Sequence, residues 1–315
     1  MTAAPTSIAF PRPPLMTRVA LAAADIKLAH SVFALPFAIL GAFMSRPTDG
    51  AGHEGWPRFG AQLVIIVACM VFARTWAMLV NRLADRRIDA RNPRTRRRVI
   101  AAGRLSVRDG IAMAFASAAA FIACTSLFWL FFANPWPLML GLPVLAWIAF
   151  YSFTKRFTLL CHIFLGGALA ASPLAAAVAI DPHFVVANPA IWFLAGMVLF
   201  WVAGFDVIYA LQDLDFDRAA GLSSIPARLG PTGAIWVSRL FHSAALGLLI
   251  AAWRTEPRFG PIFGLGVATV GCLLLVEHFV LAKRGKAGLE MAFFTINGIV
   301  SCVLGVAGVL DLSNS

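Results

Sequence analysis

Two groups of acidic residues stand out in a sequence that contains few acids. The chain has 15 Asp and Glu residues among 315, and the segment N-R-L-A-D-R-R-I-D places Asn81, Asp85 and Asp89 at intervals of four. Residues four apart lie on one face of a helix, with neighbouring Cβ atoms about 6 Å apart, and like charges at this spacing destabilise an isolated helix. We therefore expect a cation beside this group.

The second group lies in D-V-I-Y-A-L-Q-D-L-D-F-D. Asp213 and Asp217 repeat the four-residue spacing, and Asp206, seven residues before Asp213, is predicted to share their face about two turns away. Mg²⁺ prefers oxygen ligands and is usually held by one or two carboxylates together with substrate phosphates. Two such groups that face each other would hold a diphosphate through Mg²⁺. The alternative is that they are solvated charges that help to end two helices.

The composition indicates that these groups belong to a membrane protein. Hydrophobic residues make up 60% of the chain and charged residues 13%, whereas soluble domains carry about 25% charged residues. The mean hydropathy is +0.81. Five cysteines in apolar stretches without a CxxC pair disfavour a disulfide framework or a zinc site. The six histidines are scattered, which disfavours a histidine-based metal centre.

A helix needs about 20 apolar residues to cross the hydrocarbon core of a bilayer. The predicted spans are 26–45, 59–80, 107–128, 136–153, 161–180, 190–210, 232–253, 260–281 and 290–310. We therefore expect an all-α integral membrane protein with nine transmembrane helices. A single domain is predicted over residues 26–310, between an N-terminal tail (1–25) and a short C-terminal tail (311–315). Pro36, Pro143 and Pro173 are predicted to kink their helices.

Basic residues predict the orientation of the spans. They are concentrated in the N-terminal region and in the loops after the second, fourth, sixth and eighth spans, above all between Arg82 and Arg108. The positive-inside rule places these segments in the cytosol, on the same side as both acidic groups. The proline-rich start is a poor signal peptide, and we expect a cytosolic tail with an amphipathic lead-in on the membrane surface. Because the basic residues are divided among short membrane loops, nucleic-acid binding is disfavoured.

Basic and aromatic residues add candidate substrate contacts. Lys155 and Arg156 follow the fourth predicted span in Y-S-F-T-K-R. They either clamp a diphosphate and stabilise the charge of its leaving group, or extend to water at a helix end. Arg74 lies inside the second span, two turns before Asn81, and an intramembrane arginine is a functional candidate. It would bind an acceptor carboxylate or pair with Asp206. Further candidates are Arg86, Tyr151 and Tyr209.

With these motifs the chain resembles the UbiA superfamily of membrane prenyltransferases, in its 4-hydroxybenzoate polyprenyltransferase branch. The family's N-x-x-x-D-x-x-x-D motif matches Asn81, Asp85 and Asp89, and its D-x-x-x-D motif matches Asp213 and Asp217. The stretches A-R-N-P-R-T, Y-S-F-T-K-R-F-T, R-A-A-G-L-S-S-I-P-A-R-L-G and I-K-L-A-H-S-V-F-A-L-P-F-A-I-L-G-A extend the likeness over almost the whole chain.

The resemblance implies nine helices around a central cavity that opens sideways to lipid. It also implies that Mg²⁺ bridges the acidic residues and a polyprenyl diphosphate. Ionisation then yields an allylic cation that attacks an aromatic acid such as 4-hydroxybenzoate, on the way to ubiquinone in the inner membrane. Such a cation needs aromatic faces and a dry site, for which Tyr151, Tyr209 and Trp76 are candidates. Asp206 or Asp213 would accept the phenolic proton.

Two alternatives remain open at the level of sequence. A dihydroxynaphthoate acceptor in menaquinone synthesis would suit Arg74 equally well, while haem farnesylation fits less well. A cation transporter is the alternative from another class, but its acids would lie near the middle of the membrane instead of at one face. The length of the prenyl chain and the oligomeric state are not predicted.

Overall fold

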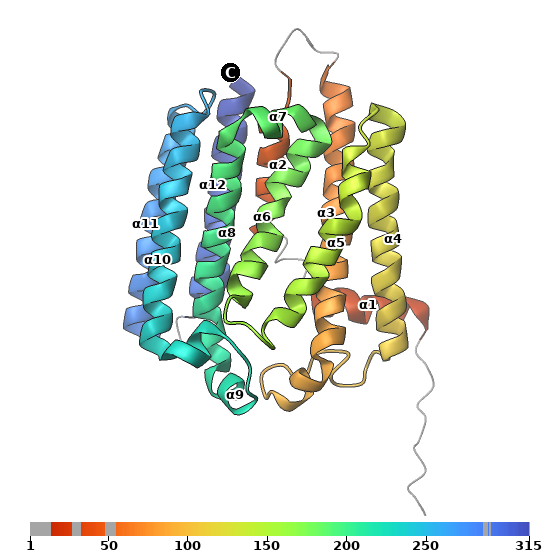
Figure 1. Ribbon diagram of the computed structural model, residues 1–315, viewed down its shortest axis with the longest axis vertical. Coiled ribbons are helices and arrows are strands. Elements are labelled where there is room, and N and C mark those ends of the chain that lie inside the picture. Colours follow the sequence, from red (N-terminus) through yellow and green to blue (C-terminus); the bar gives the residue numbers. More distant parts are fainter. Residues whose placement is uncertain (1–13, 27–32, 48–54, 286–288, 290, 315) are drawn as a thin grey trace, which may run out of the picture.

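The computed structural model describes residues 14–26, 33–47, 55–285, 289 and 291–314. All regular structure in these residues is helical. The long helices run side by side and form a bundle (Figure 1). The predicted all-α class is therefore confirmed.

Eight helical stretches of the described residues are long and apolar enough to cross a membrane. They are α3 (Gly55–Arg91), α4 (Val107–Phe132), α5 (Trp136–Thr154), α6 (Cys161–Ile180), α8 (Pro189–Ala210) with its extension, α10 (Ile225–Thr255), α11 (Pro261–Arg284) and α12 (Asn297–Asn314) with the preceding π-helical turn η4 (Met291–Ile296). The predicted span 26–45 is not one described helix. The helix α1 ends at Ile26, residues 27–32 lie outside the described residues, and the short apolar α2 begins at Leu35.

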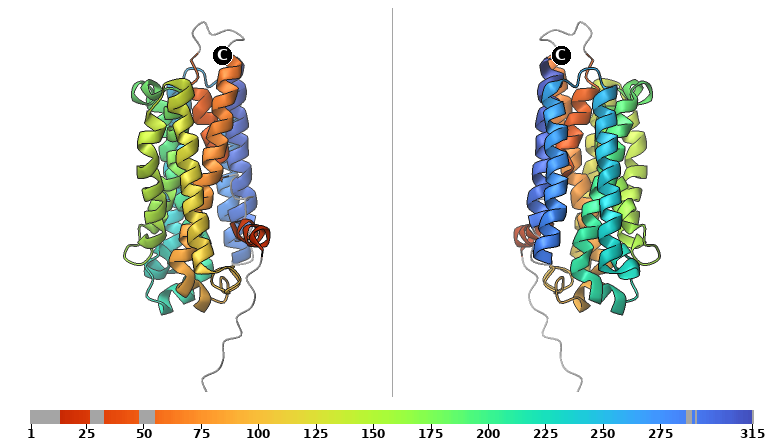
Figure 2. Two further views of the ribbon diagram at one scale, coloured as in Figure 1. Left: turned by 90° about the vertical axis from the view of Figure 1, so that its right-hand side faces the viewer. Right: turned by 90° about the vertical axis from the view of Figure 1, so that its left-hand side faces the viewer.

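The first helix, α1 (Leu15–Ile26), runs across the bundle instead of along it (Figure 2). Leu15, Met16 and Val19 are exposed. Arg82 Nε donates to Asp25 Oδ2 over 2.9 Å and ties α1 to α3. A helix with exposed apolar residues that lies across the end of a bundle suits the membrane interface.

Local signals explain several helix ends. Ser106 and Ser224 are N-caps of α4 and α10, where each side chain accepts a backbone N–H of the first turn. At Gly230 the backbone adopts φ 71°, which interrupts α10 near its start. Pro143 and Pro173 lie inside α5 and α6 as predicted. The prediction for Pro36 was wrong, because it lies in the first turn of α2, where proline replaces no helical donor.

The helix α8 lies at the centre of the bundle, and Trp201 in its middle is fully buried. Small residues allow the neighbouring helices to approach closely. A Cβ at Gly166 of α6 would lie 2.3 Å from the Leu199 carbonyl oxygen of α8, and a Cβ at Gly41 of α2 would lie 2.3 Å from the Pro173 carbonyl oxygen. The close packing predicted for the Gly166–Ala168 segment therefore has a structural counterpart.

A polar cluster also lies within the apolar bundle. Trp201 Nε1 donates to Asn297 Oδ1 over 2.6 Å, and Asn297 Nδ2 donates to Glu277 Oε1 over 3.2 Å. His242 Nδ1 and His278 Nε2 are 3.1 Å apart. These contacts join α8, α10, α11 and α12, and they partner polar groups that would otherwise be buried alone.

The two ends of the bundle differ. One end carries residues 85–106, residues 155–160 and residues 211–224, which include the short helix α9 (Leu214–Ala219), and we call it the polar end (Figure 1). The other end carries the short helix α7 (Pro182–Ala187). Large apolar side chains such as Val64, Phe115, Leu142 and Phe279 are exposed along the helices between the two ends. They form the surface that lipid would cover.

Candidate active site

A polar cavity lies at the polar end, between α3, α5, α6, α8 and the loop 92–106. Both acidic groups reach it, although more than 110 residues separate Asp85 from Asp206 in the chain. The predicted site residues in its lining are Asn81, Asp85, Asp89, Tyr151, Lys155, Arg156, Asp206, Tyr209 and Asp213. The structure therefore brings most of the predicted residues to one place.

The acidic group of α3 occupies one face of an unbroken helix. Asn81 Nδ2 donates to Asp85 Oδ2 over 3.3 Å, as the four-residue spacing requires. Arg156 Nη2 approaches Asp85 Oδ1 to 3.1 Å and donates to the Ala84 carbonyl over 2.6 Å. Arg98 Nη1 donates to both oxygens of Asp89, over 2.8 and 2.9 Å. The cations expected beside these carboxylates therefore include arginines of the chain itself.

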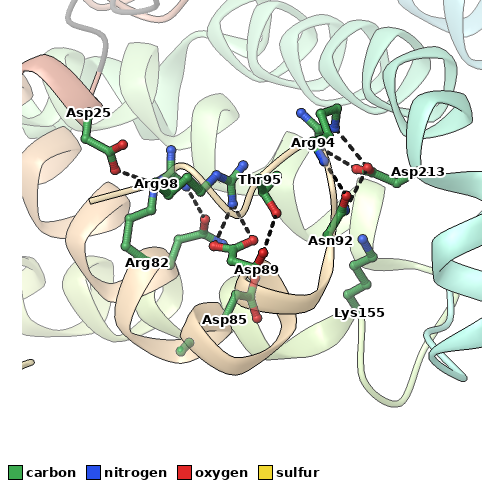
Figure 3. A network of polar contacts seen from close by, with 12 residues as sticks. Asp25, Arg82, Asp85, Asp89, Asn92, Arg94, Thr95, Arg98, Lys155 and Asp213 are labelled. Carbon is green, nitrogen blue, oxygen red and sulfur yellow. Dashed lines mark hydrogen bonds and ion pairs between the residues drawn. The ribbon is translucent and has the colours of Figure 1, made fainter. Parts of the chain in front are cut away.

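The loop 92–106 connects the two acidic groups (Figure 3). Arg94 donates through two nitrogens to Asp213, and Asn92 Nδ2 donates to Asp213 Oδ1 over 2.9 Å. Burial lowers the pKa of Arg94, but hydrogen bonding and attraction to Asp213 outweigh it, so the pKa is raised above its usual value. The Arg94 guanidinium therefore stays charged at every accessible pH.

The second acidic group differs from its prediction. The helix α8 ends at Ala210, and a 3₁₀ turn, η2 (Leu211–Asp213), separates it from α9. The shared helical face predicted for Asp206, Asp213 and Asp217 is therefore interrupted. Asp217 is fully buried and is absent from the cavity lining. The role of Asp217 as a direct ligand therefore stays a prediction without support from the cavity lining.

Asp217 instead holds one of the predicted cationic clamps. Its Oδ1 lies 2.8 Å from Lys155 Nζ, and Ser224 Oγ donates to its Oδ2 over 3.1 Å. Burial lowers the pKa of Lys155, but attraction and hydrogen bonding to Asp217 outweigh it and raise the pKa. Lys155 is therefore an ammonium ion in the cavity wall.

Asp206 has a partner that the sequence did not indicate. His162, in the first turn of α6, places Nδ1 2.6 Å from Asp206 Oδ2. His162 is 2% exposed and lines the cavity with Asp206. Of the two alternatives for Arg74, the pairing with Asp206 is not seen among the ion pairs of the described residues.

Two predicted arginines do not line the cavity. Arg74 Nε is buried and has no hydrogen-bond partner among the described residues. The electrostatic neighbours of Arg74 include Tyr151 of the cavity wall. Arg86 Nη1 donates to the Leu83 carbonyl of its own helix over 3.1 Å. The structure shows this local contact for Arg86, and its substrate contact stays a prediction.

The predicted aromatic residues have different surroundings. Tyr209 stacks on Phe293 with ring centroids 4.0 Å apart, and the Arg94 guanidinium lies 5.3 Å from the Tyr209 centroid. Tyr151 also faces the cavity. Trp76 Nε1 donates to the Leu145 carbonyl over 2.9 Å and joins α3 to α5. Tyr151 and Tyr209 can shield a cation, whereas Trp76 packs between helices.

The sequence contained a signal for some of the residues that were missed. Asn92 and Arg94 lie in A-R-N-P-R-T, directly after the first motif. The arginines of this loop were interpreted through membrane orientation and the family resemblance, and neither predicts which carboxylates they contact. His162 had no such signal, because its partner is 44 residues away.

The donors of the cavity fit a hard divalent cation. Asn81, Asp85, Asp89 and Asp213 supply oxygen atoms from two sides. Among the residues that the structure describes, no three His, Cys, Asp or Glu side chains are close enough to hold a metal ion alone. Hard divalent cations such as Mg²⁺ usually take one or two carboxylates and complete their shell with water and substrate phosphate.

Known proteins share this architecture. The family model described as "UbiA prenyltransferase family" matches residues 34–299. A 4-hydroxybenzoate octaprenyltransferase of Marinobacter nauticus is 30% identical over 264 residues, which are 82% of this chain and 85% of that protein. One from Nitrosospira multiformis is 31% identical over 248 residues, covering 78% and 81%.

Solved structures agree with the sequence comparisons. The apo structure of a UbiA homolog from Aeropyrum pernix K1 superposes with a TM-score of 0.78 at 32% identity, covering 90% of this chain and 98% of that one. A UbiA homolog from Archaeoglobus fulgidus bound to GPP and Mg²⁺ has the same fold, with a TM-score of 0.66 at 18% identity over 93% and 99%. The chain therefore belongs to the UbiA prenyltransferase family, and it is a multi-pass membrane enzyme.

Proposed function

We propose that the enzyme transfers a polyprenyl group from polyprenyl diphosphate to 4-hydroxybenzoate, in ubiquinone biosynthesis. The observation that carries the proposal is the meeting of Asp85 and Asp213 in one cavity with Lys155 and Arg156. This set can neutralise a diphosphate from two sides. The names of the curated relatives support 4-hydroxybenzoate as the acceptor.

The donor diphosphate would bind between the two acidic groups. Mg²⁺ ions, held by Asn81, Asp85 and Asp89 on one side and by Asp213 on the other, would stabilise the negative charge that develops on the leaving diphosphate. The Mg²⁺ in a homologous structure supports this choice of cation. Asp217 contributes by holding Lys155 Nζ at 2.8 Å.

Cationic side chains would complete the diphosphate site. Lys155 is charged because its pKa is raised, and Arg156 reaches the cavity from the same loop. Fixed cations that face a leaving group stabilise the charge as the C–O bond breaks, without reorganising during the reaction. Tyr151 and Tyr209 would face the allylic cation, and the apolar bundle would limit its capture by water.

The acceptor would bind deeper than the diphosphate. Arg74 is a candidate for its carboxylate, because it lies two turns from Asn81 on α3 and has a buried nitrogen without a partner among the described residues. A dihydroxynaphthoate acceptor remains the alternative. Both are acidic, so Arg74 does not separate them.

We further propose that the protein lies in the inner membrane with its polar end in the cytosol. The basic loop 92–106 lies at that end, which supports this orientation through the positive-inside rule. A cation transporter is disfavoured, because the cavity carboxylates gather at one end of the bundle instead of along a path through it.

An activity assay tests the proposal. Membranes that contain the protein are supplied with Mg²⁺, one labelled polyprenyl diphosphate and a panel of 4-hydroxybenzoate, 1,4-dihydroxy-2-naphthoate and benzoate. We expect prenylated 4-hydroxybenzoate and its loss when the metal is chelated. If only dihydroxynaphthoate gives a product, that acid is the acceptor instead of 4-hydroxybenzoate. Mg²⁺ flux without any product would support a transporter.

Substitutions test the residue assignments. Asp85→Asn and Asp213→Asn keep the side-chain shape but remove the charge, and we expect at least a 100-fold lower turnover, on the order of a lost catalytic group. Asp215→Asn is the matched control, because Asp215 is exposed and lies outside the cavity lining. Near-normal turnover of Asp85→Asn or Asp213→Asn would remove the metal-site assignment.

A further inference from the structure

The contact between His162 and Asp206 joins two helices at the cavity wall. His162 starts α6, Asp206 lies in α8, and Nδ1 to Oδ2 is 2.6 Å. The histidine side chain is 3% exposed and the aspartate side chain 23% exposed. The imidazole is therefore fixed within the protein, while the carboxylate keeps a face toward the cavity.

The other ring nitrogen determines where the proton is. The backbone N–H of Ile225, at the start of α10, donates to His162 Nε2 over 3.3 Å. A nitrogen that accepts an N–H bears a lone pair, so the proton of a neutral imidazole is on Nδ1. His162 Nδ1–H then donates to Asp206 Oδ2. Three helices thus fix one tautomer of this ring.

Asp206 differs from the other carboxylates of the cavity. Asp85, Asp89 and Asp213 each contact an arginine. A carboxylate that is paired with a cation is a weak proton acceptor. Asp206 Oδ2 faces His162 Nδ1, and the Ile225 N–H at Nε2 assigns this ring its neutral form; among the described residues no hydrogen bond or ion pair to Asp206 Oδ1 is seen.

We propose that His162 is a positioning residue that holds Asp206 as the proton acceptor for the aromatic substrate. This inference rests on the proposed function and chooses between Asp206 and Asp213, the two carboxylates that the sequence offered as the base. Asp213 is unsuited to the role, because Arg94 binds both of its oxygens. His162 keeps its own proton throughout and acts only by orienting Asp206.

The reaction balances with Asp206 as the base. The C–O bond of the donor breaks and its electron pair leaves with the diphosphate. A π electron pair of the ring forms the new C–C bond at the ring carbon ortho to the hydroxyl group. At the same time the phenolic O–H proton passes to the Asp206 carboxylate. The ring hydrogen at the substituted carbon then moves to the oxygen and restores the phenol. Asp206 returns its proton to solvent.

The experiment separates bond breaking in the donor from transfer to the acceptor. Diphosphate ionisation is measured by scrambling of a bridging ¹⁸O label in the polyprenyl diphosphate, and transfer by prenylated 4-hydroxybenzoate. We expect Asp206→Asn to lower transfer about 100-fold or more, as for a lost general base, with scrambling within about threefold of wild type. His162→Leu should lower transfer about tenfold or more, and its scrambling should also stay within about threefold of wild type.

Conservative variants distinguish positioning from structural support. His162→Asn and His162→Gln retain an amide donor, and at least one should recover most of the transfer lost in His162→Leu. His183→Leu, at an exposed histidine of α7, is the control and should leave both readouts unchanged. The proposal is overturned if Asp206→Asn transfers normally, if His162→Leu lowers scrambling and transfer in parallel, or if neither amide variant exceeds His162→Leu. A wild-type protein without scrambling or transfer would instead contradict the proposed function.

Discussion

Each carboxylate of the cavity is bound by a side chain from another part of the chain. The loop 92–106 supplies Arg98 to Asp89 and Arg94 to Asp213. The spacing of the acids predicted the pair Asn81 and Asp85, because periodicity is a local property of a helix. It did not predict the arginine partners, since the fold of an irregular loop follows from contacts that become visible only in three dimensions.

At the residue scale, Arg94 tests whether the loop is part of the site. Arg94→Ala removes a permanent cation from Asp213, so we expect at least a tenfold loss in kcat/KM for the polyprenyl diphosphate, as for a lost bidentate charged hydrogen bond. Steady-state kinetics in membranes measures it. Arg104→Ala is the control from the same loop, because Arg104 is exposed and its Nη2 donates to the Arg97 carbonyl over 2.7 Å. Equal kinetics for both variants would contradict the role of Arg94.

A second prediction at the residue scale concerns Arg74. If it binds the acceptor carboxylate, Arg74→Ala raises the KM for 4-hydroxybenzoate by about tenfold or more, while the KM for the donor changes little. Arg239→Ala is a control arginine within a span, where the guanidinium lies 4.8 Å from the Trp236 ring centroid. A raised donor KM with an unchanged acceptor KM would overturn the assignment.

At the scale of elements, apolar length predicted the spans well. The segments 136–153 and 161–180 correspond closely to α5 and α6. Two departures have physical causes. The four-residue spacing of Asp213 and Asp217 indicated a continuous helix, and the turn Leu211–Asp213 was missed because its residues include no proline or glycine to mark it. The cap at Ser224 starts α10 earlier than the apolar pattern indicated, since Arg228, Gly230 and Pro231 interrupt the apolar run near its start.

The contact between α6 and α8 predicts the effect of a single methyl group. Gly166→Ala would place Cβ against the Leu199 carbonyl, a backbone atom that cannot move alone. We expect a loss of about 1–3 kcal/mol in stability, as for overpacking in a core, measured as a lower Tm in detergent. Gly247→Ala is the control, because its Cβ would meet nothing within 4 Å. A Gly166→Ala protein as stable as this control would refute the close contact.

At the scale of the whole molecule, the first and last described helices reach opposite ends of the bundle (Figure 1). The helix α1 lies at the polar end and α12 finishes at the other end. Composition and loop charge predicted this class of protein because both follow from the bilayer as a solvent. The depth and shape of the cavity depend on how the helices pack, and so the sequence did not predict them.

The proposed orientation can be measured directly. We expect a reporter that is active only outside the cytosol to be active when fused to the C-terminus and inactive when fused to the N-terminus. The physical reason is the basic polar end, which the positive-inside rule retains in the cytosol. A reporter within the exposed turn near Phe157 provides the cytosolic control. Activity of the N-terminal fusion would reverse the orientation.

The length of α3 affects how substrates enter the enzyme and how products leave it. Its 37 residues extend about 55 Å at 1.5 Å per residue, while the hydrocarbon layer is about 30 Å thick. Its carboxylates can therefore stand in the headgroup region while its apolar half stays among acyl chains. The diphosphate of the substrate can then stay near water while its isoprenoid chain stays in the lipid. Pyrophosphate can depart into water, and the alkylated ring can drift away laterally within the leaflet.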